Sequence, residues 1–109
     1  MPRTPGPVSR VPTAPNENWI HGRVLDIRPD PTSFRGEGAD WKLQVAGADD
    51  VPGARNFARS RVGSVIELFV PSVPPGLDLA VGDFIRARIS FQGDERGGRF
   101  VLVDDLRKE

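Results

Sequence analysis

The chain has 109 residues, a length that fits one small domain around a single core. Its 15 basic and 15 acidic residues give a formal net charge of zero, which argues against a protein that coats nucleic acid by bulk attraction; any anion must be held by local patches. Cysteine is absent, which excludes disulfide frameworks and thiolate metal sites.

Apolar stretches in the chain are short. The first residues contain no apolar segment of the signal-peptide type, and no window approaches the roughly 20 apolar residues that span a bilayer. We therefore expect a cytoplasmic protein with no membrane partner. Twelve glycines and eleven prolines leave little room for long helices, and they predict an all-β domain.

Residues 1–16 form a proline-rich leader. They contain five prolines and almost no large apolar side chain, so they cannot bury enough surface to offset the entropy lost on ordering. We expect a flexible tail, partly in the polyproline II conformation, and a folded domain over residues 17–109. Arg3 and Arg10 in the tail either contact a polyanion or are solvated charges.

The first strand is predicted over residues 19–28. Ile20 and Val24 fall on one face, and the alternation slips near Leu25, as it does at a β-bulge. Gly22 indicates close packing or bending of the strand.

A turn-rich, mobile loop is expected over residues 29–39, and a short second strand over residues 41–45. The second strand alternates cleanly between a core phase and a solvent phase. The core phase holds Trp41, Leu43 and Val45, and the solvent phase holds Lys42 and Gln44. This shared phase favours the core for Trp41 over a role as a stacking platform.

A long connection over residues 47–63 leads to the third strand, which is predicted over residues 64–70. Within the connection, residues 54–61 have the composition for a turn or two of helix, with Arg55 and Arg59 on one side. In the third strand one phase holds Ile66, Leu68 and Val70, and the other holds Val65, Glu67 and Phe69. Prolines then end the strand.

The fourth strand, residues 81–91, has the clearest alternation in the chain. One side holds Val81, Ile85, Ala87, Ile89 and Phe91, and the other holds Phe84, Arg86, Arg88 and Ser90. Residues 92–98 predict a hairpin turn, and residues 99–106 a fifth strand in which both phases are apolar. Five short strands with a closing hairpin predict a small closed barrel.

Three segments resemble the OB (oligonucleotide/oligosaccharide-binding) fold, especially the modules that bind single-stranded nucleic acid. Residues 19–24 look like the opening strand, residues 79–89 like a Leu-x-x-Gly-Asp turn feeding the fourth strand, and residues 97–106 like the closing strand. The resemblance implies a five-stranded Greek-key barrel over most of the domain. The link over residues 72–80 departs from it, because many OB domains place a helix there.

OB domains bind ligands across the second and third strands, between the loop after the first strand and the loop before the fifth. Aromatic side chains there stack on bases, and basic side chains contact phosphates. The candidate nucleic-acid-binding residues are Trp19, Arg23, Phe34, Arg35, Lys42, Gln44, Phe69, Phe84, Arg86, Arg88 and Arg96. Phe84, Arg86 and Arg88 form an alternating row of aromatic and guanidinium groups.

Each candidate also has a structural alternative. Phe69 and Phe84 could cover a second small apolar layer, and Arg86 and Arg88 could be solvated charges on an outward face. The basic run over residues 55–61 either clamps a nucleic-acid backbone or is an exposed loop.

Catalysis has little support in the sequence, which has one histidine, no nucleophile motif and no phosphate-binding loop. His21 has no second histidine or cysteine to complete a metal site. We therefore expect no cofactor, no metal and no enzyme activity. The leading hypothesis is a module that binds single-stranded DNA or RNA. The alternatives are a protein-interaction or assembly subunit, and a subunit that tunes a separate nucleic-acid enzyme.

Overall fold

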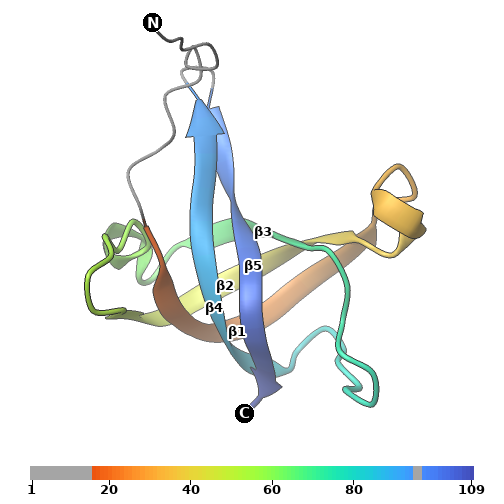
Figure 1. The fold of residues 1–109 in the computed structure, drawn as a ribbon. Coiled ribbons are helices and arrows are strands. Elements are labelled where there is room, and N and C mark those ends of the chain that lie inside the picture. Colours follow the sequence, from red (N-terminus) through yellow and green to blue (C-terminus); the bar gives the residue numbers. More distant parts are fainter. Residues whose placement is uncertain (1–15, 95–96) are drawn as a thin grey trace, which may run out of the picture.

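The computed structural model describes residues 16–94 and 97–109, which form a closed barrel of five strands (Figure 1). The strands are β1 (Asn18–Pro29), β2 (Ala39–Asp50), β3 (Val65–Val70), β4 (Phe84–Asp94) and β5 (Gly97–Lys108). Single 3-10 turns, η2 (Phe34–Gly36) and η3 (Arg59–Arg61), lie in the β1–β2 and β2–β3 loops. The predicted all-β barrel is confirmed. The leader residues 1–15 lie outside the described residues.

The barrel closes in the order β1-β2-β3-β5-β4 and back to β1. Every pairing is antiparallel except that of β3 with β5, which is parallel and short. In it Leu68 faces Phe100 and Phe69 faces Val101. The parallel pairing brings the start of β5 beside the end of β3, although the two are far apart in sequence. The β4–β5 hairpin projects beyond the barrel (Figure 1).

The core consists of the inward phase of each strand, as the alternation predicts. Its most deeply buried members are Ile20, Val24, Trp41, Leu43, Val45, Leu68, Val70, Ile85, Ala87 and Ile89. Trp41 exposes only 1% of its surface, which confirms the core prediction for this ring. The outward side chains of the strands are therefore the ones left to meet a ligand.

β1 bends through two irregularities, which let it pair with β2 and β4 at once. The slip predicted at Leu25 is confirmed, because the register with β2 shifts between Val24 and Asp26. A second shift lies between His21 and Gly22. A Cβ atom on Gly22 would lie 2.1 Å from the carbonyl oxygen of Gln44, so the close packing expected there requires glycine.

The two apolar phases of β5 are resolved by bulges. Phe100 and Leu106 are buried, whereas Val103 is 43% exposed. The register with β4 shifts on both sides of Arg88, and Asp105 has a φ of 58°. These irregularities change which residues face inward, so no single alternation could describe the strand.

Two local predictions are wrong. Val81 lies in a turn and is 57% exposed, because Gly82 (φ 99°) breaks the strand and β4 starts only at Phe84. Residues 54–61 form no helix beyond the single turn of η3. There the Asn56 side chain accepts a hydrogen bond from the Ala58 N–H at 3.0 Å, and such local bonds compete with helix formation.

The link between β3 and β4 also has no helix, and instead packs Leu77 and Leu79 against the core. Its last turn is the predicted glycine-aspartate turn. The Asp83 carboxylate accepts the Ala80 N–H at 2.9 Å, and the two residues also share a backbone bond. Among the described residues, no helix has the length and apolar character needed to cross a membrane.

Candidate nucleic-acid interface

Arginine guanidinium groups lie over the outward aromatic rings of the barrel. The distances from guanidinium carbon to ring centroid are 4.2 Å for Arg99–Phe69, 4.9 Å for Arg23–Phe84, 4.9 Å for Arg86–Trp19, 5.8 Å for Arg88–Trp19 and 5.3 Å for Arg35–Phe34. Contacts of this kind at exposed sites contribute about 0.5–1 kcal/mol. They place arginine side chains beside aromatic rings on the outer surface of the barrel.

Phe69 anchors one group of these contacts, on β3. The ring is half-buried, and its strand neighbours are Asp40 on β2 and Val101 on β5. The Arg99 guanidinium lies over the ring and 3.6 Å from the Asp40 carboxylate. Ring, guanidinium and carboxylate thus form one cluster at the seam of β2, β3 and β5.

Arg99 is a candidate that sequence analysis missed. It comes beside Phe69 only through the parallel pairing of β3 with β5, which no local pattern reveals. The available signal was its position at the start of the closing strand, immediately after the glycine pair of the hairpin.

The β1–β2 loop is held in shape by its own hydrogen bonds and packs against this cluster at Gly38. The Ser33 hydroxyl donates to the Asp30 carbonyl at 2.6 Å and accepts the Gly38 N–H at 2.8 Å. The hydrogen bond from the Thr32 side chain lowers the pKa of the Asp30 carboxyl. A Cβ atom on Gly38 would lie 2.8 Å from the Phe69 ring, so glycine lets the loop close onto that ring.

The tip of the same loop presents Phe34 and Arg35 to solvent. Phe34 is 84% exposed, and Arg35 has a φ of 61°, in the left-handed region that non-glycine residues rarely adopt. An open pocket of about 250 Å³ lies between this tip and the end of β3. Its lining residues are Ser33, Phe34, Arg35, Glu37, Phe69, Pro71 and Ser72.

Lys42 and Gln44 continue the surface along β2. Both side chains are exposed, and their partners on β3 are Glu67 and Val65. Within residues 16–94 and 97–109, Lys42 and Arg35 form no ion pair. Both cations are therefore available to an anionic ligand.

The other predicted residues form a second group, on the outer face of β1 and β4. Three cross-strand pairs build it, and we call this set the β1–β4 ladder: Trp19 with Arg88, His21 with Arg86, and Arg23 with Phe84. Phe84 is 40% exposed under the Arg23 guanidinium. The alternating aromatic and guanidinium row predicted for β4 is thus extended across to β1.

Carboxylates neutralise much of the ladder. Arg88 lies 3.5 Å from Glu17 and 3.0 Å from Asp104, and Arg86 lies 4.0 Å from Asp49. Among the described residues Arg23 makes no ion pair. Arg88 is consequently the least available of the predicted phosphate ligands. The His21 ring lies 3.8 Å from the Glu109 carboxylate.

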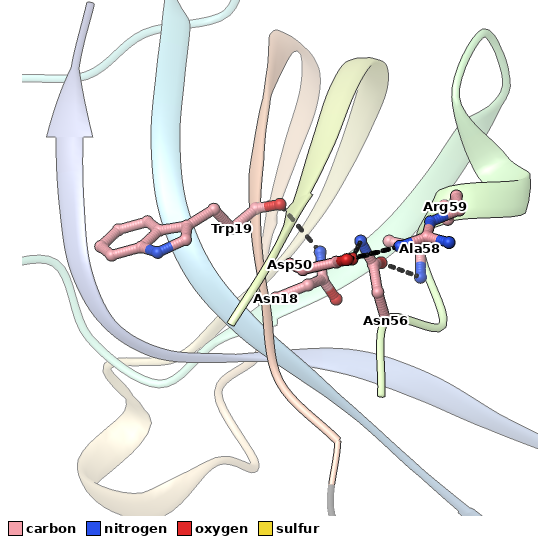
Figure 2. Close-up of polar contacts among 6 residues, drawn as sticks. All are labelled: Asn18, Trp19, Asp50, Asn56, Ala58 and Arg59. Atoms are coloured by element: carbon pink, nitrogen blue, oxygen red, sulfur yellow. Dashed lines mark hydrogen bonds and ion pairs between the residues drawn. The ribbon is translucent and has the colours of Figure 1, made fainter. Parts of the chain in front are cut away.

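The basic run of the β2–β3 loop is partly neutralised as well (Figure 2). The Arg59 guanidinium donates to both oxygens of Asp50, at 2.5 and 2.6 Å. The Asn56 side chain donates to the same carboxylate at 3.0 Å, and this bond, then Arg59, lowers the pKa of Asp50. In Figure 1 this loop lies on the opposite side of the barrel from the β1–β2 loop.

The structure therefore divides the predicted site residues into two sets. Phe34, Arg35, Lys42, Gln44 and Phe69 gather around the β1–β2 loop and the β2–β3 face, and Arg99 joins them. Trp19, Arg23, Phe84, Arg86 and Arg88 form the ladder. The sets meet where Arg23 faces Gln44. Arg96 lies outside the described residues.

No group of three or more His, Asp or Glu side chains that could hold a metal ion occurs in the described part of the chain. Comparison with protein-family models, curated proteins and solved structures finds no match. The inference of function therefore rests on the geometry of this surface.

Proposed function

We propose that the chain is an OB-fold module that binds single-stranded nucleic acid across the β2–β3 face, between the β1–β2 loop and the β4–β5 hairpin. The strand order and the parallel pairing of β3 with β5 support the OB assignment. We propose no catalytic step for the module itself.

The observation that carries this proposal is the pair of arginine-on-aromatic contacts that flank the pocket. Phe69 with Arg99 lies on the strand side, and Phe34 with Arg35 lies on the loop side. Stacking of a base on an aromatic ring contributes ~1–3 kcal/mol, and a guanidinium group beside the ring can reach the attached phosphate. Lys42 adds a cation along the strand, and Arg23 extends the path.

Local rather than global charge supports this binding, because the chain has no net charge. If Arg35, Lys42 and Arg99 each contact one phosphate, with Arg99 exchanging its Asp40 partner for the phosphate, the logarithm of affinity should fall against the logarithm of salt concentration with a slope of roughly −2. Such a slope is modest, so we expect weak binding at physiological salt and measurable binding at low salt.

Fluorescence anisotropy with a labelled thymidine oligonucleotide tests the proposal. Phe69→Ala removes a stacking ring and should weaken binding about tenfold, and Arg99→Ala should weaken binding and flatten the salt slope by roughly 0.7. Arg107→Ala is the matched control, because it removes an exposed cation that pairs with Asp105 on β5 and touches no ring of this site. Absence of binding at low salt, or equal effects of Arg99→Ala and Arg107→Ala, would contradict the proposal.

A second candidate, a protein-interaction module, is favoured by the β1–β4 ladder. Two of its three arginines, Arg86 and Arg88, pair with carboxylates, and tryptophan and arginine are the residues that most often dominate protein interfaces. In that case Trp19→Ala should abolish binding to one defined protein partner while affinity for the oligonucleotide is unchanged. Retention of that partner by Trp19→Ala would exclude the ladder as its docking site.

A further inference from the structure

The pocket beside Phe69 contains a carboxylate, although phosphate-binding surfaces are expected to be basic. Glu37 lines the pocket together with Phe34, Arg35 and Phe69. Its side chain is exposed and makes no ion pair or hydrogen bond with any described residue. Within a site for nucleic acid, such a carboxylate repels the backbone and needs a hydrogen-bond donor on the ligand.

Base edges differ in the donors that they offer. A carboxylate has two acceptor oxygens side by side, and only guanine presents two adjacent donors on its Watson–Crick edge, N1–H and the 2-amino group. Adenine and cytosine place an acceptor beside their amino group, and thymine and uracil place one N–H between two carbonyl groups. Glu37 thus matches the guanine edge better than any other.

Arg35 complements the Hoogsteen edge of the same base, which adjoins the Watson–Crick edge. A guanidinium group donates two parallel hydrogen bonds to guanine O6 and N7, the commonest specific contact between proteins and bases. Arg35 is next to Phe34, whose 84% exposed ring offers a face for stacking. The pocket volume of about 250 Å³ has room for one base.

We propose that this pocket selects an unstacked guanine in the bound single strand, stacked against Phe34 or Phe69, with Glu37 and Arg35 hydrogen-bonded to its donor and acceptor edges. The inference rests on the proposed function, because the neighbouring nucleotides cross the β2–β3 face. Guanine at one position would then give a sequence preference to an otherwise general binder.

The test compares oligonucleotides of about 12 thymidines with versions that carry one central guanine, adenine, cytosine or inosine. Inosine is guanine without its 2-amino group. The guanine version should bind roughly tenfold tighter than the others, inosine included, since a bidentate pair discriminates by ~1–3 kcal/mol. Glu37→Gln, which replaces one acceptor by a donor, should remove this preference, so that the guanine version binds this variant no tighter than the thymidine version does.

Each result has a distinct meaning. The pocket assignment is overturned if the natural chain binds all versions equally, or if the guanine preference survives in Glu37→Gln. In either case, binding of the thymidine version leaves the proposed function standing. No binding of any version at low salt overturns both. Competition by free guanosine monophosphate at concentrations as low as those of the oligonucleotide overturns strand binding and assigns the pocket to a free nucleotide.

Discussion

Arg35 combines backbone strain with a position at the tip of the proposed binding loop. Its φ of 61° lies in the region that costs a non-glycine residue about 1 kcal/mol or more, and Gly36 beside it has a φ of 67°. The Arg35 guanidinium lies 5.3 Å from the centroid of the Phe34 ring. We interpret this strain as the cost of presenting the side chain to a ligand.

Arg35→Asn should therefore raise stability and lower affinity. Asparagine tolerates the left-handed conformation, so the free energy of unfolding should rise by up to about 1 kcal/mol, while loss of the guanidinium weakens oligonucleotide binding severalfold. Thermal denaturation and anisotropy measure the two effects. Arg28→Asn makes the same exchange in extended strand β1 and should not stabilise. A loss of stability in Arg35→Asn would contradict the strain.

At the scale of elements, a strand bend and a turn hold the barrel together. β1 pairs with β2 along its whole length and with β4 over residues 18–23, and Gly22 lies in the part that pairs with both. There the Gln44 carbonyl leaves no space for a side chain. The turn before β4 is held by the Asp83 carboxylate, which accepts the Ala80 N–H. The same carboxylate forms an ion pair with Lys108 on β5 at 3.4 Å. The bend at Gly22 and the turn at Asp83 position the outward residues of the β2–β3 face and of the β1–β4 ladder.

Gly22→Ala should destabilise the barrel by at least about 3 kcal/mol, because its Cβ atom meets backbone that cannot move without breaking the β1–β2 pairing. Gly53→Ala is the comparison: Gly53 has a φ of 83° and open space around it, so the cost is limited to about 1–2 kcal/mol of conformational strain. Denaturant unfolding measures both. A smaller loss for Gly22→Ala than for Gly53→Ala would refute the steric argument.

Asp83 predicts a pH dependence. The hydrogen bond from the Ala80 N–H, with a further contribution from Lys108, lowers the pKa of this carboxyl below its ordinary value of 3.8. A lowered pKa in the folded state stabilises the protein above about pH 3.8, and this stabilisation is lost as pH falls through the lowered value. Asp83→Asn keeps an acceptor without the charge, so its melting temperature should fall less between pH 5 and about pH 3 than that of the natural chain. Identical pH profiles would contradict the assignment.

At the scale of the whole molecule, the features that depend on local alternation could be predicted from the sequence, whereas those that depend on long-range strand pairing could not. The outward and inward sides of β4 from Phe84 onward follow from its period of two, and the burial of Trp41 follows from its phase. The end of β2 could not be predicted in this way, because residues 46–50 are small or acidic and are extended only by their pairing with β1. Asn16, assigned to the leader, instead exchanges two hydrogen bonds with the Phe91 backbone.

The candidate site shows the same limit. Aromatic and basic residues could be found singly, but their division into two sets depends on which strands become neighbours in the closed barrel. Arg99 comes beside Phe69 through a strand pairing that spans some 30 residues of sequence. Arg88 is unavailable to a ligand because it pairs with Glu17 and Asp104, which lie in two other segments of the chain. Such contacts are set by tertiary structure rather than by local pattern.

The most direct test of the central claim is nuclear magnetic resonance titration of the full chain with a thymidine oligonucleotide at low salt. We expect the amide signals that shift to concentrate at Phe34, Lys42, Phe69 and Arg99, with little change at Arg107 or along the outer face of β4 at Arg88. Shifts confined to the β1–β4 ladder, or no shifts at oligonucleotide concentrations up to the millimolar range, would contradict binding across the β2–β3 face.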